Sequence, residues 1–236
     1  MQILRHEEFK EGCEAQCNGP YDGQWSKTMV GYGPEESHFV VELTYNYNIS
    51  TYKLGNDFQG ITIRSSEALA RARAGAWPVE EEGSRTLVRA PGGYKFFLLD
   101  LPQPKQCDPV ISVAISVSKM ASSLTWWAGL LALQPISATA TTTSLSYDPT
   151  GASLVLQTTP GGEAVEHCKA GGRIAFSCPA VELKGLEACA REKYGEKAVL
   201  TSFVSLPTPG KADVQVSLNS SALLHRSAPG CNPRGS

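Results

Sequence analysis

Long apolar runs, a surplus of charge and an even set of cysteines are all lacking in this sequence of 236 residues. The longest apolar stretch, 124–133, is broken by Thr125 and falls far short of the roughly 20 residues that a membrane-spanning helix needs. A formal net charge of −2, with no basic stripe, argues against nucleic acid as a partner. Residues 1–8 are polar and acidic and contain no apolar core of a signal peptide. We expect an intracellular protein that binds neither membrane nor nucleic acid.

The seven cysteines are scattered and odd in number, unlike the dense, even set of a secreted disulfide framework. Cys13 and Cys17 have the spacing of two zinc ligands, but no second pair of cysteines or histidines is well spaced to complete a site. We therefore expect reduced thiols. The sequence also contains no spacing typical of a catalytic triad and no glycine-rich phosphate loop.

A unit of strand, helix and three further strands recurs at intervals of roughly 50 to 60 residues. Alternating apolar residues predict opening strands at 60–64, 110–117 and 173–178. Serine, lysine, proline and glutamate follow these strands, as expected where a helix begins. We expect the three helices to end near residues 74, 131 and 193.

Turns rich in proline and glycine predict hairpins after each helix, because proline presets φ and glycine permits a positive φ. These turns lie at 90–93, 147–151 and 207–210, and apolar strands at 94–99 and 152–157 follow two of them. Before the first full unit, Gln2–Glu7 and His38–Asn46 fit the second and fourth strands of another copy. We expect that the opening strand and helix of this copy are missing.

Several stretches of this sequence resemble the glyoxalase-type proteins of the vicinal-oxygen-chelate superfamily, which also contains bleomycin resistance proteins and dioxygenases. The matching stretches are 4–9, 17–23, 42–47, 52–58, 90–96, 172–179 and 208–211. The resemblance covers residues 1–216 and is most specific over 3–100. Ala132 departs from it, since it stands where the family has a helix-ending glycine.

This resemblance implies an α+β fold in which tandem βαβββ modules form two glyoxalase-like domains, at residues 1–105 and 106–216. It implies further that the first domain lacks its opening strand and helix and the second its last strand, as in a truncated or alternative form. Residues 217–236 are rich in Ser, Pro, Gly and Asn and are expected to be a disordered tail.

In this superfamily, paired modules curl into a cup in which four inward side chains hold a divalent metal, and the metal stabilises an enediolate. Strand alternation places Phe39, Val41, Leu43 and Tyr45 on an apolar face for the helices. Glu42 then lies on the opposite face, at a ligand position, and it is the surviving ligand-type residue.

The other ligand positions carry residues that bind a hard cation poorly. Among them are Gly60, Phe97, Ser112, Val155 and Arg173. Lys95 and Leu99 share the face of Phe97. The residues expected to line the cup are Gly60, Thr62, Arg64, Phe97, Ser112 and Arg173.

We therefore expect a non-catalytic protein, without cofactor, that binds a small anionic ligand or a protein partner. Arg64 and Arg173 would hold the anion through paired hydrogen bonds. Alternatively, both are rim residues in water or paired with acids such as Glu67 and Glu182.

Two further interpretations remain open. One is a lyase that uses Zn, Ni or Mn to act on the hemithioacetal of glutathione and methylglyoxal. The other is a non-functional variant that folds poorly because its sheets have unpaired edges. The resemblance favours cytoplasm or mitochondrion as the location.

Overall fold

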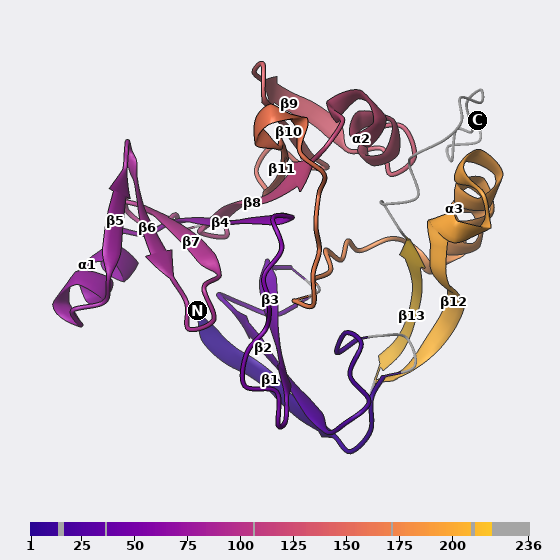
Figure 1. Ribbon diagram of the computed structural model, residues 1–236, viewed down its shortest axis with the longest axis horizontal. Helices are drawn as coiled ribbons and strands as arrows, with labels where there is room; N and C mark the ends of the chain where they lie inside the picture. The colour runs from indigo at the N-terminus through magenta and orange to yellow at the C-terminus, as the bar shows by residue number, and fades with distance from the viewer. Residues whose placement is uncertain (14–16, 36, 106, 171, 209–210, 219–236) are drawn as a thin grey trace. The chain divides into compact units, whose positions relative to one another are not determined.

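Figure 1 shows the computed structural model, in which the chain divides into two compact units. The first unit contains residues 1–118 and 135–172, and the second contains residues 119–134 and 173–236. The structure describes residues 1–13, 17–35, 37–105, 107–170, 172–208 and 211–218. The predicted domain boundary at residues 105 and 106 stays a prediction, and the predicted tail lies outside the described residues apart from 217 and 218, which end a strand.

The first unit begins with a three-stranded antiparallel sheet in the order β1-β2-β3 (Figure 1). Its strands are β1 (Gln2–Phe9), β2 (Trp25–Gly31) and β3 (Val40–Asn46). The predicted strands at 2–7 and 38–46 are therefore present, and β3 begins two residues later than expected. The alternation within β3 is also as predicted, since Glu42 faces away from Leu43 and opposes Met29 of β2.

The expectation that the apolar face of β3 packs against helices is wrong for the described residues. Leu43 is 50% exposed and Tyr45 is 53% exposed. Alternation decides which residues share a face of a strand, but it cannot tell whether another element covers that face.

An eight-stranded sheet forms the rest of the first unit, in the order β5-β6-β7-β4-β8-β11-β10-β9 (Figure 1). The strands are β4 (Phe58–Arg64), β5 (Val79–Glu82), β6 (Arg85–Arg89), β7 (Lys95–Leu99), β8 (Val110–Val117), β9 (Gln134–Ala138), β10 (Thr142–Ser146) and β11 (Ser153–Thr158). A short 3-10 helix, η1 (Pro160–Gly162), follows β11.

Two copies of the predicted module make up this sheet. In each copy the opening strand pairs in parallel with the last strand, β4 with β7 and β8 with β11. The two opening strands then pair with each other antiparallel, which joins the copies edge to edge. The predicted turns at 90–93 and 147–151 connect β6 to β7 and β10 to β11. These two sets of strands therefore have matching pairings.

Helix α1 (Ser66–Ala74) follows β4 directly and is held there by its first turn. The Ser65 hydroxyl oxygen accepts a hydrogen bond from the Ala68 N–H at 3.0 Å, so it satisfies one of the donors that a helix start leaves unpaired. Leu69 is 2% exposed and anchors the helix in the core. Arg73 pairs with Glu81 of β5, whose carboxylate also accepts from Thr86 of β6.

The second unit contains α2 (Met120–Trp127), α3 (Ala180–Tyr194), the 3-10 helix η2 (Glu196–Ala198) and the hairpin of β12 (Val199–Thr208) and β13 (Lys211–Leu218). Trp126 is 1% exposed and meets the Tyr194 ring edge-on at 5.0 Å. Trp127 is also buried, so both tryptophans belong to the core. The predicted turn at 207–210 falls between β12 and β13 in the sequence, and residues 209 and 210 lie outside the described part.

Two expectations about the second unit are corrected. Residues 173–178 form no strand, because no described strand lies beside them to satisfy their backbone hydrogen bonds. Helix α2 ends at Trp127 rather than near residue 131, and Ala132 has a φ of 60°, a conformation that favours glycine.

No helix among the described residues is long and apolar enough to cross a membrane.

Candidate functional site on the eight-stranded sheet

One face of the eight-stranded sheet brings together most of the residues predicted to line the cup. Thr62 in β4 opposes Phe97 in β7 on one side and Ser112 in β8 on the other. Ser112 in turn opposes Ser153 in β11. Since residues in register share a face, these side chains form one lateral row across four strands. Thr62, Ser112 and Ser153 are all half-buried, so the row borders solvent.

The row belongs to a surface that we name the cup face. It consists of Gly60, Thr62, Arg64, Lys95, Phe97 and Ser112.

Gly60 and Phe97 touch on the cup face. A Cβ atom built on Gly60 would lie 2.7 Å from the Phe97 ring, and Gly60 has a φ of 133°, which side chains disfavour. The Arg85 guanidinium lies over the same ring, 3.7 Å from its centroid. Phe97 is 5% exposed, so its ring is packed between a strand backbone and a cation. The ring thus fills the space where the resemblance implies a metal and substrate oxygens.

Two cations on the cup face, Arg64 and Lys95, have no carboxylate within ion-pair distance in the part of the chain that the structure describes. The Arg64 Nε–H donates to the Pro102 carbonyl oxygen at 2.9 Å. Lys95 is half-buried beside Arg89, its register partner. Both cations are therefore placed to attract an anion to this face.

Two other arginines near this face are already paired with acids of the edge strand β5. Arg85 pairs with Glu82 at 3.3 Å, and Arg89 pairs with Glu80 at 3.1 Å. All four of these side chains are well exposed, so the pairs contribute little to stability. They reduce the net positive charge at the outer edge of the sheet, while Arg64 and Lys95 keep theirs near the centre.

The strand predicted to carry Arg173 does not form among the described residues, and its partnership with Arg64 stays a prediction. Arg173 lies in an irregular, exposed segment of the second unit, because the strand that was to hold it does not form. An alternating pattern within five or six residues cannot distinguish a strand from an extended loop. Lys95, on β7, is the second cation that the structure places on the cup face.

The donor chemistry of the cup does not fit a divalent metal. Gly60 and Val155 offer no donor, Phe97 offers an aromatic ring, and Ser112 offers a neutral hydroxyl group. Arg64 and Lys95 on the same face would repel a cation. Among the described residues no group of three or more His, Cys, Asp and Glu side chains is placed to hold a metal ion.

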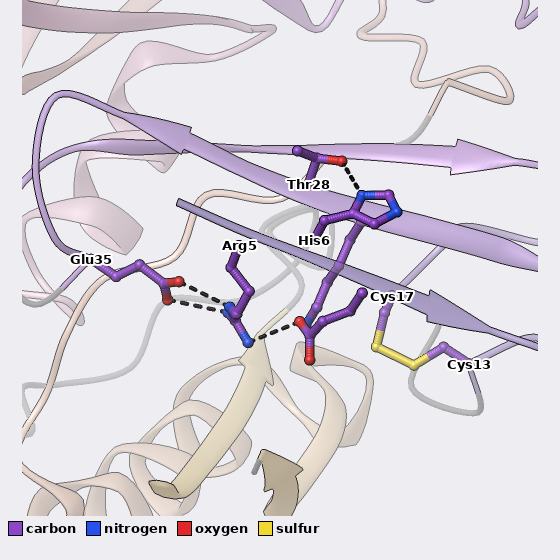
Figure 2. Close-up of polar contacts among 8 residues, drawn as sticks. Arg5, His6, Cys13, Cys17, Thr28 and Glu35 are labelled. Carbon is purple, nitrogen blue, oxygen red and sulfur yellow. Dashed lines mark hydrogen bonds and ion pairs between the residues drawn. A yellow bond between two sulfur atoms is a disulfide. The ribbon is translucent and has the colours of Figure 1, made fainter. Parts of the chain in front are cut away.

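Glu42 lies in the separate three-stranded sheet, where it is exposed and opposes Met29. The neighbouring charges on its face are largely paired with one another. Glu7 forms ion pairs with Arg5 at 2.9 Å and with Lys27 at 3.3 Å. Arg5 also donates two hydrogen bonds to the Glu35 carboxylate (Figure 2). Because its cations are already neutralised, this face suits an anion less well than the cup face.

Sequence reasoning missed this charged cluster and a second polar contact. The alternation of Arg5, Glu7 and Phe9 in β1 was a usable signal for the cluster, since residues two apart share a strand face. The second contact joins His167 Nδ1 to Asp57 Oδ2 at 2.7 Å. These two residues are 110 positions apart, and no local pattern connects them.

The edge-to-edge βαβββ modules define the vicinal-oxygen-chelate fold. Solved structures of maize glyoxalase I share it: one has a TM-score of 0.65 over 93% of this chain and 85% of that chain, at 17% sequence identity. A second, a maize V278E mutant, has a TM-score of 0.67 over 87% of this chain and 75% of that chain, at 19% identity. At these identities the likeness concerns the fold alone.

This chain belongs to the glyoxalase domain-containing protein 4 family. Its sequence is 52% identical to glyoxalase domain-containing protein 4 of Mus musculus over 219 residues, which is 92% of this chain and 72% of that protein. It is 37% identical to "Glyoxalase 1" of Caenorhabditis elegans, over 92% of this chain and 74% of that protein. The family's N-terminal model matches residues 60–100, and the C-terminal domain model of glyoxalase domain-containing protein 4-like proteins matches residues 119–220.

Proposed function

We propose that this chain binds a small anionic ligand on the cup face and does so without a metal ion. The observation that carries the proposal is the position of Arg64 and Lys95, two cations without a carboxylate partner among the described residues, beside the polar row. Thr62 and Ser112 add hydroxyl groups that can donate to a carboxylate. An ionised acceptor strengthens such hydrogen bonds about twofold over neutral ones.

The Phe97 ring supports a binding role over a catalytic one. Because the ring packs between Gly60 and the Arg85 guanidinium, an oxygen-rich ligand cannot reach the sheet backbone there. A small anionic ligand that contacts the cations and hydroxyl groups of the cup face fits this arrangement. Intracellular metabolites of this kind are available in the cytoplasm and the mitochondrion, the two locations that we propose.

A specific ligand class can be chosen for the test. An Arabidopsis thaliana protein that is 34% identical to this chain over 109 residues carries the name "Probable lactoylglutathione lyase, chloroplastic". S-lactoylglutathione is an anionic conjugate of glutathione, and we propose it as the probe.

The test is isothermal titration of S-lactoylglutathione into protein that has been treated with a chelator and then dialysed. We expect binding with the same dissociation constant, within about twofold, before and after equimolar Zn, Ni or Mn is added. Loss of an exposed charge elsewhere, in Arg71→Ala, serves as the control and should leave the constant unchanged, since Arg71 pairs with Glu67 on the surface of α1.

The alternative, a metal-dependent lyase acting on a glutathione hemithioacetal, predicts a different result. It requires that thioester form from methylglyoxal and glutathione only when a metal is present, and that Glu42→Ala abolish the reaction. Such a result would replace the binding proposal.

A further inference from the structure

A second feature of the first unit lies outside the cup face, in the loop between β1 and β2. The structure joins Cys13 and Cys17 in a disulfide (Figure 2), which corrects the expectation that all cysteines are reduced. Cys107 and Cys168, in contrast, are free and exposed, and Cys189 is free and buried. Cys13 and Cys17 are both half-buried, so small reagents can reach them.

The cysteine pair is connected to a buried network of asparagines. The Cys13 N–H donates to Asn18 Oδ1 at 3.0 Å, and Asn18 is 3% exposed. The Asn18 amide donates both to the Tyr21 carbonyl oxygen at 2.8 Å and to Asn46 Oδ1 at 2.9 Å. Asn46, at the end of β3, is 4% exposed and donates to the Tyr52 hydroxyl oxygen at 3.1 Å. We name Asn18, Asn46 and Tyr52 the asparagine network.

The rest of the loop is fixed by backbone contacts on the other side of the cysteines. The Gly12 N–H donates to the Asp22 carbonyl oxygen at 2.9 Å, and the Trp25 indole donates to the Glu11 carbonyl oxygen at 2.9 Å. Residues 20–24 and 46–49 line a pocket of about 300 Å³ beside the network. Tyr21 belongs both to the pocket wall and, through its carbonyl group, to the network. The conformation of the loop at Cys13 therefore bears directly on the shape of the pocket.

We propose that Cys13 and Cys17 form a site of reversible thiol–disulfide exchange with a low-molecular-weight disulfide, and that the oxidised pair holds the pocket wall in place. The five-residue segment from Cys13 to Cys17 is short enough for the second thiol to reach a mixed disulfide formed on the first. The bond removes conformations from the reduced ensemble, which favours the hydrogen-bonded positions of Gly12 and Cys13.

The exchange takes place in two balanced steps. The thiolate of one cysteine attacks a sulfur of the small disulfide, the S–S bond breaks, and one small thiolate leaves. The thiolate of the other cysteine then attacks the protein sulfur of the mixed disulfide, the Cys13–Cys17 bond forms, and the second small thiolate leaves. Two electrons pass from the protein thiols to the small disulfide, and the two thiol protons pass to the departing thiolates through water.

The test uses the full chain in buffers of reduced and oxidised glutathione. Thiols are trapped by acid and alkylation, and the mass of the peptide containing Cys13 and Cys17 is measured by mass spectrometry. We expect the peptide to pass from one tenth to nine tenths oxidised over a change of about 80-fold in the ratio of squared reduced glutathione to oxidised glutathione, as for any intramolecular disulfide. Stable glutathione adducts on Cys13 or Cys17, or no oxidation at all, would overturn the proposal.

A second measurement follows hydrogen exchange at the Gly12 and Cys13 amides in the wild-type chain. Reduction should accelerate their exchange by about tenfold or more, since the constraint of a short loop is lost. Cys13→Ser/Cys17→Ser should exchange at the reduced rate in either buffer. Cys107→Ser/Cys168→Ser, which keeps the pair, should behave as wild type. Equal exchange rates in the oxidised and reduced wild-type chain would show that the bond does not control the loop.

Discussion

The two modules of the eight-stranded sheet have the same topology and nearly the same register, but different chemistry on one face. In the module that begins with β4, this face carries Arg64, Lys95 and Phe97. In the module that begins with β8, it carries Ser112 and Val155 and no described ion pair. The buried face is apolar in both, with Leu98 and Leu154 at 6% and 3% exposure. Packing therefore determines one face of each module, and the other face is left to determine function.

The largest change in stability is expected where the two opening strands, β4 and β8, meet. Gly60 and Ala114 are register partners, but only Gly60 has a positive φ and a phenyl ring against its Cα. We expect Gly60→Ala to lower the free energy of unfolding by about 2–5 kcal/mol, from backbone strain and overpacking combined. Ala114→Gly should lower the free energy of unfolding by about 1 kcal/mol or less. Urea unfolding of both variants measures the difference. Equal losses of stability would contradict the proposed difference between the two positions.

The starts of the two module helices differ as well. The Ser65 hydroxyl caps α1 and also accepts from the Gln103 amide at 2.8 Å, whereas the Lys119 side chain makes no capping bond to α2. We expect Ser65→Ala to destabilise the protein by about 1–2 kcal/mol. Lys119→Ser should instead stabilise it by about 0.5–1 kcal/mol. Thermal unfolding of the two variants checks the prediction, which is wrong if both substitutions change the stability in the same direction.

The helix ends give a smaller contrast. Gly75 ends α1 at a φ of −80°, which any residue adopts, whereas Ala132 after α2 has a φ of 60°. A left-handed alanine costs roughly 1–2 kcal/mol, so Ala132→Gly should raise the free energy of unfolding by about 1 kcal/mol after the greater backbone entropy of glycine is subtracted. The control is Gly75→Ala, which should be nearly neutral. A destabilised Ala132→Gly would contradict the backbone assignment.

The smallest effect concerns the hairpin turns and depends on pH. The Thr150 N–H and then the Thr150 hydroxyl group donate to the Asp148 carboxylate and lower its pKa. The turn at 90–93 contains no acid. Because the folded pKa is below the unfolded value, the contribution of Asp148 is complete above about pH 4 and is lost as the pH falls through the folded pKa.

Asp148→Ala should therefore lose less stability than wild type when the pH is lowered from 6 to 3. Urea midpoints at both pH values measure this change, with Asp100→Ala as a control at an exposed acid. An unchanged pH dependence would mean that the Thr150 contacts do not persist in solution.

The sequence predicted the modules better than it predicted the site. Alternation at 60–64 and 110–117 and the turns at 90–93 and 147–151 are local signals, and the structure agrees with each. Gly60, Thr62, Phe97 and Ser112 were placed on one face by the same alternation. The strand predicted at 173–178, which was to carry Arg173, does not form, because no described strand lies beside these residues.

Long-range contacts were out of reach of the sequence. The Arg85 guanidinium over Phe97, the His167 contact to Asp57 and the hydrogen bond between Asn18 and Asn46 each join side chains that no short pattern relates. Such contacts depend on register and on loop paths, which the packing of the whole chain decides.

The central claim, that the cations of the first module hold an anion without metal, is tested most directly by reversing one charge. Lys95→Glu, titrated with S-lactoylglutathione in the presence of a chelator, should bind at least about tenfold more weakly than wild type, as expected for the loss of one hydrogen bond to a charged group. Ser112→Glu, on the other module, should weaken binding less. A dissociation constant for Lys95→Glu within about twofold of wild type would contradict the account.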